Sequence, residues 1–243
     1  MSYVLIVGAK SDIAKAVARE YAHNGYDLYL AARDSDELVD FAKDITTRTQ
    51  RVVKLVELDI VNYSSHQTFY DQLDEKPLGV ISTVGYLGDQ ELAQRDFDEA
   101  KKIIDTNYTG VVSLLNIVAN DFEAKRAGFI VAISSVAGDR GRKSNYIYGS
   151  AKAALTAYLS GLRNRLHDAQ VQVLTVKPGF VNTKMTADMD LPEKLTAEPS
   201  EVAEDIFSAQ QSGKSILYTK WIWRYIMMVI GLIPEWQFKK MSI

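Results

Sequence analysis

The feature that most constrains this chain is a regular alternation of short apolar runs with longer amphipathic runs. Apolar runs rich in β-branched residues lie at 3–9, 26–34, 51–60, 78–85, 128–138 and 171–180. Runs with helical periodicity separate them, at 11–24, 35–49, 65–73, 96–125 and 145–167. Strands that are apolar on both faces and separated by helices are typical of a parallel sheet covered on both sides. The pattern therefore predicts a doubly wound α/β fold with a mostly parallel sheet.

No linker, repeat or low-complexity tract divides the 243 residues, so we predict a single domain. Residues 182–200 follow the last predicted strand and show no clear periodicity. In a doubly wound sheet, ligands bind at the carboxyl ends of the strands. A long irregular loop at this edge is typical of a functional lid, so we predict that residues 182–200 form a substrate loop.

The composition excludes several classes of protein. The formal net charge of −3 argues against a nucleic-acid-binding protein, which usually carries a basic excess. The absence of cysteine excludes disulfides and thiolate metal ligands, and we predict no metal site. The first ten residues, MSYVLIVGAK, are apolar too briefly for a secretion signal and lack its basic start. We therefore expect a cytoplasmic protein.

A tight turn follows the first predicted strand. The stretch GAKSDIA, residues 8–14, leads directly into a helix, whose free N–H groups and positive dipole end favour a phosphate. This interpretation places ligand contacts at Gly8, Lys10, Ser11, Asp12 and Ile13. A dinucleotide-binding turn usually has three glycines, and here Asp12 and Ala14 occupy two of those positions. The alternative is a simple turn capped by Ser11 or Asp12.

The residues after the second and third predicted strands indicate which dinucleotide would bind. A cofactor with a free ribose 2′-hydroxyl is usually held by a carboxylate here, whereas a 2′-phosphate is held by an arginine. The second strand ends in AARD and places Arg33 at this position, which favours NADP(H); the alternative is a solvated surface arginine. Asp59 and Ile60 end the third strand. Asp59 can accept a hydrogen bond from an adenine amino group or cap the next helix.

A tyrosine and a lysine four residues apart suggest acid–base chemistry. Tyr148 and Lys152 lie among small residues in NYIYGSAKAALTAYL, and positions i and i+4 share a helix face. A nearby ammonium favours a phenolate, so we expect Lys152 to lower the pKa of Tyr148 from about 10 towards neutral pH. Such a phenol suits general acid catalysis of carbonyl reduction. Ser135, at the end of the fifth strand, would hold the carbonyl. The alternative is a small-residue face that packs against another helix.

Together these motifs resemble the short-chain dehydrogenase/reductase family, in order and spacing over about residues 1–220. The resembling stretches are YGSAK, ISSVAG before it, DTNYTG with Asn107, and KPGFVNT after the last strand. The resemblance implies a Rossmann-type catalytic domain over 1–220, in which Tyr148 transfers the proton and Ser135 orients the carbonyl. It implies that Lys152 binds the nicotinamide ribose and that Asn107 holds a water of the proton relay. It places cofactor contacts at Gly85, Asn107, Tyr148, Lys152, Pro178, Gly179, Val181 and Thr183.

Two departures from the family pattern affect the cofactor side. The glycine turn lacks two glycines, and the fourth strand ends in STVGYLG where the family commonly has Asn-Asn-Ala-Gly. In both departures the sequence resembles a bacterial subgroup of the family, which is similar to the reductase subunit of decaprenylphosphoryl-ribose 2-epimerase. That resemblance implies a keto-sugar on a polyprenyl phosphate as the substrate. Taken singly, Asn107 is also typical of a polar group inside a helix, and Thr183 of a helix cap.

The final segment, residues 221–243, is predicted to belong to the same domain. It begins with the apolar run WIWRYIMMVIGLI at 221–233, which is too short to span a bilayer comfortably. Basic residues and tryptophans flank the run, as in helices at a headgroup boundary: Lys220, Arg224, Lys239, Lys240, Trp221, Trp223 and Trp236. One interpretation is therefore contact with the inner membrane surface through residues 221–240. The alternative is a helix that covers the substrate cleft or a subunit interface.

The sequence thus predicts an oxidoreductase that uses NADP(H) to reduce a ketone to a secondary alcohol. The preferred substrate is a keto-sugar on a polyprenyl phosphate, and the alternative is a small ketone or an acyl intermediate. A third interpretation is an NADP(H)-binding redox sensor without turnover, which would not need the Asn–Ser–Tyr–Lys set. The family usually pairs through two long helices, so the resemblance implies a homodimer or homotetramer formed through residues 96–125 and 148–167.

Overall fold

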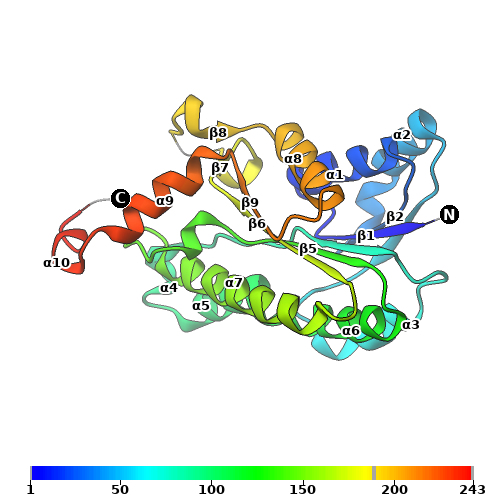
Figure 1. The fold of residues 1–243 in the computed structure, drawn as a ribbon, viewed down its shortest axis with the longest axis horizontal. Coiled ribbons are helices and arrows are strands. Elements are labelled where there is room, and N and C mark those ends of the chain that lie inside the picture. The colour runs from blue at the N-terminus through cyan, green and yellow to red at the C-terminus, as the bar shows by residue number, and fades with distance from the viewer. Residues whose placement is uncertain (1, 188–189, 242–243) are drawn as a thin grey trace.

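A seven-stranded parallel sheet forms the centre of the protein, as a computed structural model of residues 2–187 and 190–241 shows (Figure 1). The strands are Tyr3–Val7 (β1), Asp27–Ala32 (β2), Val53–Glu57 (β3), Gly79–Ser82 (β4), Phe129–Ile133 (β5), Gln172–Pro178 (β6) and Ile216–Thr219 (β9). Their order is β3-β2-β1-β4-β5-β6-β9, and all neighbours are parallel. The order reverses between β1 and β4, which is the doubly wound arrangement. The predicted fold class is confirmed.

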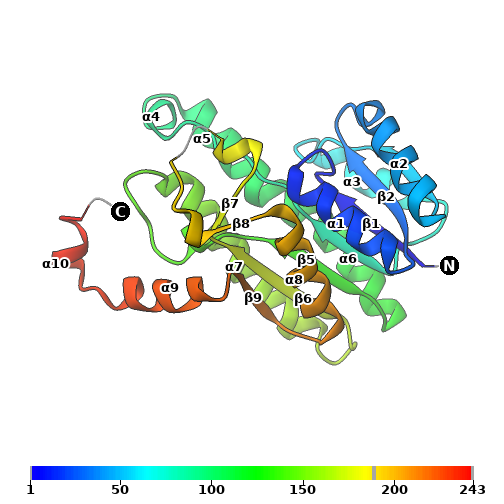
Figure 2. The same ribbon diagram turned by 90° about the horizontal axis from the view of Figure 1, so that it is seen from above.

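Helices cover both faces of this sheet (Figures 1 and 2). One layer contains Asp12–His23 (α1), Val39–Thr49 (α2) and Pro199–Gln211 (α8). The other contains His66–Asp71 (α3), Gln90–Ala93 (α4), Phe97–Ile104 (α5), Gly110–Lys125 (α6) and Tyr146–Leu166 (α7). Successive strand residues point to opposite faces. Val4 and Ile6 therefore pack under the first layer, and Leu5 and Val7 under the second.

The C-terminal part of the sheet was not predicted from the sequence. Residues 196–219 contain α8, β9 and half of a small two-stranded sheet, in which Phe180–Val181 (β7) pairs with Thr196–Ala197 (β8). The predicted loop at 182–200 is therefore shorter than expected, because α8 begins at Pro199. Residues 188 and 189 of that loop lie outside the described residues.

The long helix predicted at 96–125 is interrupted at its centre. Between α5 and α6, residues Asp105–Thr109 form a π-helical turn, and Asn107 is fully buried within it. Such turns are uncommon and frequently occur at functional sites. Here the wider turn directs the Asn107 amide at the segment after β4, where its Nδ2 donates to the Tyr86 carbonyl at 2.6 Å.

The last two helices, Ile222–Leu232 (α9) and Glu235–Phe238 (α10), extend away from the sheet as an arm (Figure 2). Trp223 anchors this arm, because its Nε1 donates to the Leu195 carbonyl at 3.0 Å and its ring packs against Phe180. A Cβ atom at Gly179 would overlap the Trp223 ring, so glycine is required where the arm meets the end of β6. Within residues 2–187 and 190–241, no helix is long and apolar enough to cross a membrane.

Candidate active site

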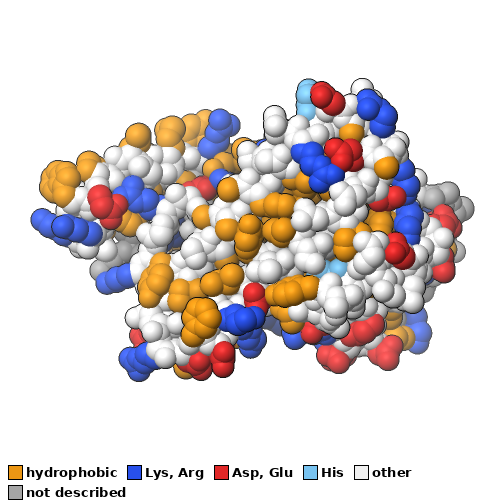
Figure 3. All heavy atoms as spheres, turned by 90° about the horizontal axis from the view of Figure 1, so that it is seen from below, with side chains coloured by type: hydrophobic (Ala, Val, Ile, Leu, Met, Phe, Trp, Pro, Cys, Tyr) orange, Lys and Arg blue, Asp and Glu red, His pale blue; other side chains and the backbone are white. Residues whose placement is uncertain are grey.

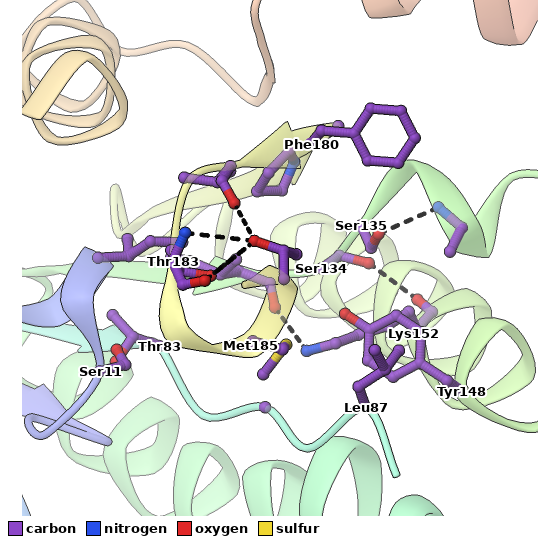
Figure 4. Close-up of a pocket in the computed structure, with 18 of the residues that line it drawn as sticks. Ser11, Thr83, Leu87, Ser134, Ser135, Tyr148, Lys152, Phe180, Thr183 and Met185 are labelled. Atoms are coloured by element: carbon purple, nitrogen blue, oxygen red, sulfur yellow. Dashed lines mark hydrogen bonds between the residues drawn. The ribbon is translucent and has the colours of Figure 1, made fainter. Parts of the chain in front are cut away.

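A cavity of about 400 Å³ lies at the carboxyl ends of β1, β4, β5 and β6. Many of the residues predicted from the sequence line it: Lys10, Ser11, Asp12, Ile13, Gly85, Ser135, Tyr148, Lys152, Pro178, Gly179, Val181 and Thr183. In Figure 4, Ser135, Tyr148 and Lys152 lie together at one end, and Ser11 and Thr83 lie at the other. The fold therefore joins the predicted catalytic residues and the predicted phosphate turn in one space.

Ser135 and its neighbour Ser134 have different surroundings, as strand alternation predicts. The Ser134 hydroxyl donates to the Lys152 carbonyl at 2.9 Å and shares a 2.7 Å hydrogen bond with Thr156 on α7. The Ser135 hydroxyl accepts from the Ala137 N–H at 3.1 Å and also hydrogen-bonds the Tyr148 phenol. Ser135 is therefore the serine that can hold a carbonyl oxygen beside that phenol.

The expected effect of Lys152 on Tyr148 is wrong for this structure. Burial raises the pKa of Tyr148 to about 12, although the hydrogen bond with Ser135 acts in the opposite direction. The Lys152 Nζ lies 5.7 Å from the centre of the Tyr148 ring and donates to the carbonyls of Val84 and Ile133, at 3.2 and 3.0 Å. Burial lowers the pKa of Lys152 to about 7. Removal from water thus disfavours both the negative charge of a Tyr148 phenolate and the positive charge of the Lys152 ammonium. The phenol is therefore protonated at neutral pH.

Asn107 lies behind the cavity rather than in its wall. Its Nδ2 donates to the Ile103 and Tyr86 carbonyls, at 2.8 and 2.6 Å, and its Oδ1 accepts from the Tyr86 N–H at 3.2 Å. These bonds fix the segment that contains Gly85, as expected of a polar group inside a helix. The predicted role of Asn107 in a proton relay stays a prediction.

The turn after β1 fits a dinucleotide phosphate. Gly8 has a φ of +84°, and a Cβ atom there would lie 3.0 Å from the Thr83 hydroxyl and 3.1 Å from the Val84 nitrogen. Only glycine permits this close approach, which brings the start of α1 to the cavity. Ser11 caps α1, since its hydroxyl accepts from the Ala14 N–H at 3.1 Å. The helix N-terminus then presents N–H groups and a positive dipole end.

Asp12 occupies one of the positions at which a dinucleotide-binding turn usually has glycine. Its carboxylate accepts from the Lys184 N–H at 2.9 Å and so joins the start of α1 to the segment after β7. The carboxylate therefore has a structural partner, which explains how a negative charge is accommodated at a phosphate turn.

Five of the residues predicted to contact the cofactor do not line this cavity. Gly8, Arg33, Asp59, Ile60 and Asn107 are absent from its wall. Arg33 is exposed just beyond β2. The Asp59 carboxylate accepts from the Val61 N–H at 3.1 Å, and the Ile60 backbone packs against Gly110. Cofactor contacts at these positions stay predictions.

The sequence analysis missed about half of the cavity wall. The missed residues are Thr83, Val84, Leu87, Ile133, Ser134, Val136, Ala137, Arg142, Asn145, Phe180, Lys184, Met185 and Thr186. Thr83 and Val84 immediately precede Gly85 at a strand end, which was a usable signal. Arg142 and Asn145 lie immediately before α7, and neither residue type at its position indicated a ligand contact.

A second cavity of about 680 Å³ adjoins the first. Leu87, Arg142, Asn145 and Phe180 line both. Its far wall is the inner side of α9, with Trp223, Ile226 and Ile230. The arm therefore bounds a space that shares part of its wall with the cavity lined by Tyr148.

Comparisons with known proteins agree with this fold. Residues 2–194 match the family model of the short chain dehydrogenases. An uncharacterized oxidoreductase of Mycobacterium tuberculosis is 35% identical over 241 residues, which cover 98% of this chain and 96% of that protein. A short-chain dehydrogenase from Sphingobium yanoikuyae in complex with NADPH has a TM-score of 0.85 at 23% identity, with 97% of both chains covered. The bulky-bulky ketone specific alcohol dehydrogenase from Comamonas testosteroni has a TM-score of 0.80 at 21% identity, with 97% of this chain and 96% of that chain covered.

Proposed function

This chain belongs to the short-chain dehydrogenase family, and we propose that it is an NADPH-dependent reductase that converts a ketone to a secondary alcohol. One observation carries the proposal: Ser135 and a protonated Tyr148 occupy one end of a cavity whose other end is a helix N-terminus. Hydrogen-bond donors for a carbonyl oxygen thus stand in the same space as a phosphate cradle.

The residues divide the chemistry between them. NADPH, when bound, supplies a hydride to the carbonyl carbon. The Ser135 hydroxyl orients the carbonyl oxygen, and Tyr148 donates its proton to that oxygen as negative charge develops there. A phenol with a pKa of about 12 is protonated at neutral pH, so Tyr148 carries the proton that the reduction requires. Ser11 and Ile13 would hold the phosphates, and Pro178, Gly179, Val181 and Thr183 would hold the nicotinamide half.

Steady-state assays test this function. NADPH oxidation is followed with a panel that contains small ketones, acyl intermediates and detergent-dispersed keto-sugars on polyprenyl phosphates. We expect turnover with at least one ketone, and turnover fastest with the lipid-linked sugars. Saturable NADPH binding without oxidation for any member of the panel would instead support a redox sensor.

The preference for NADPH rests on Arg33. This side chain is exposed just beyond β2, where it can bind a 2′-phosphate. The NADPH in the Sphingobium yanoikuyae structure is consistent with this choice. We expect Arg33→Ala to raise the KM for NADPH by about tenfold, since a charge-assisted contact is lost. The KM for NADH should change less than twofold. Equal changes for both cofactors would contradict the assignment.

The lipid-linked substrate is supported by the two adjoining cavities and by the outer face of the arm. Along α9 and beyond it, large apolar side chains are exposed: Trp221 (72%), Tyr225 (54%), Met228 (56%), Val229 (58%), Leu232 (77%) and Trp236 (60%). Figure 3 shows apolar and basic side chains along the projecting arm. An apolar helix face with basic residues suits an anionic membrane surface, and we propose that α9 binds one while its inner side lines the second cavity.

Membrane binding by the arm can be tested without disturbing that cavity. Met228 and Leu232 are exposed and line neither cavity. We expect wild-type protein to sediment with phosphatidylglycerol-containing liposomes, and the Met228→Glu/Leu232→Glu variant to bind at least tenfold less. Unchanged NADPH binding by the variant serves as the folding control. Equal, negligible sedimentation of both proteins would remove this proposal.

A further inference from the structure

Three polar atoms around the second cavity are buried without a hydrogen-bond partner. They are Nε of Arg142, Nε2 of Gln90 and Oδ1 of Asn145. Within residues 2–187 and 190–241, only two other side-chain atoms share this state, and neither of their residues lines a cavity described above. Buried polar groups are almost always hydrogen-bonded. Their concentration at one place therefore points to a ligand.

Arg142 carries the positive charge of this cluster. Its Nη2 contacts the Met227 sulfur at 3.1 Å, which is a weak acceptor. None of the ion pairs within the described ranges includes it. The nearby carboxylate of Asp139 is bound instead by Lys177 at 2.6 Å and by the Tyr218 hydroxyl at 3.1 Å. Burial lowers the pKa of Arg142. The charge of Asp139 acts in the opposite direction on that pKa but forms no ion pair with Arg142. A half-buried guanidinium whose Nε is fully buried without a hydrogen-bond partner is costly, and an anionic ligand would offset that cost.

Gln90 and Asn145 add directional groups beside the guanidinium. The Gln90 Oε1 accepts from the Ile147 N–H at 3.1 Å, which fixes the amide and leaves its NH₂ group as a donor. The Asn145 Oδ1 is an acceptor. Two donors and one acceptor match a ligand with an anionic group next to a hydroxyl or another donor.

The cluster of Arg142, Gln90 and Asn145 lies next to the cavity that contains the proposed catalytic residues. Arg142 and Asn145 line both cavities, and Tyr148 lines the first. The remaining wall of the second cavity contains Asp89, Ser144 and Gly88 beside the apolar Leu87, Phe180, Leu195, Trp223, Ile226 and Ile230. The Asp89 carboxylate is bound within its own helix cap, since it accepts from the Glu91 and Leu92 N–H groups at 2.8 and 3.0 Å. We propose that Arg142, together with Gln90, binds an anionic group of the substrate, while the inner side of α9 holds an apolar chain attached to it. This inference deepens the proposed function and rests on it for the identity of the ligand as substrate.

Calorimetry with three matched probes tests the subsite on protein saturated with NADPH. The probes are farnesyl phosphate, farnesoic acid and farnesol, below their micelle concentrations. We expect at least one anion to bind wild-type protein tenfold or more tightly than farnesol, and the tighter of the two anions identifies phosphate or carboxylate as the preferred group. Arg142→Gln should weaken the binding of that anion by at least tenfold and change farnesol binding less than twofold.

Further variants complete the design. Arg142→Lys should retain part of the anion preference. Gln90→Leu should weaken binding of the preferred anion by a few-fold, because it removes one hydrogen-bond donor and keeps the positive charge of Arg142. Arg95→Gln, which removes an exposed arginine outside both cavities, should match wild type. Equal affinities of wild type for all three probes, or an unchanged anion preference in both Arg142→Gln and Gln90→Leu, would overturn the proposal.

The failure of this inference and of the proposed function can be distinguished. Tyr148→Phe should bind farnesyl phosphate as wild type does, because the phenol is not part of the subsite. Arg142-dependent anion binding without reduction of any ketone would leave the subsite in place and reject the reductase. Ketone reduction with no anion preference would reject the subsite and leave the reductase in place.

Discussion

Replacing Tyr148 with phenylalanine is expected to reduce ketone turnover by about 10²–10⁴-fold, the usual contribution of a general acid. The substitution removes one oxygen and keeps the ring, so the packing of α7 should persist. NADPH affinity, measured by fluorescence titration, should stay within twofold of wild type. The loss should therefore be found in kcat rather than in cofactor binding.

The matched control is Tyr146→Phe. Tyr146 lies two residues earlier on α7, is exposed, and lines neither cavity. This variant should turn over ketone at the wild-type rate. Undiminished turnover in Tyr148→Phe would reject Tyr148 as the proton donor.

The second large effect concerns Lys152, which is only 2% exposed. Its pKa is about 7 in the folded protein and 10.5 as the ordinary value. Between these values the unfolded chain binds the proton and the folded chain does not, so stability rises with pH. Below pH 7 Lys152 is protonated in both the folded and the unfolded state. The full cost of burying its ammonium then lowers the stability of the folded protein. Relative to Lys152→Met, wild type should therefore gain up to about 1.4 kcal/mol of unfolding free energy per pH unit between pH 7 and 10.

Urea denaturation of both proteins at pH 7, 8 and 9 measures this difference. Groups that titrate equally in both proteins cancel in the comparison. Lys43→Met, which removes an exposed lysine of α2, should run parallel to wild type. A Lys152→Met profile that also runs parallel to wild type would show that the ammonium is not desolvated as the structure indicates.

The first six strands and most of the helices between them were predictable because the apolar runs are buried on both faces of the sheet, apart from the half-buried edge strand β3. The turn at 8–11 was readable from Gly8 and the Ser11 cap. By contrast, β9 is only four residues long and its first residue, Ile216, is half exposed. The start of α8 carried an unused signal, since Pro199 at its first position follows the capping residue Glu198.

The catalytic end of the site was predictable because Ser135 follows the end of β5 and because Tyr148 and Lys152 lie on the next helix at family spacing. Arg142, Gln90 and Asn145 were not, since Gln90 begins α4 and the other two precede α7, and only the tertiary fold joins these two segments. The direction of the Tyr148 pKa shift was wrong for a related reason. Spacing along a helix indicates that Lys152 is near, whereas burial and the two carbonyls that hold its ammonium depend on β4 and β5.

The most direct test of the central claim is a crystal structure of the protein with NADPH. Reacting atoms in a productive complex lie about 3–3.5 Å apart. A carbonyl group placed between the cofactor and the acid then brings the nicotinamide C4 within roughly 5 Å of the Tyr148 hydroxyl. We predict that distance, with the pyrophosphate at the start of α1. A nicotinamide ring bound outside the cavity, or with its C4 directed away from Tyr148, would contradict this account.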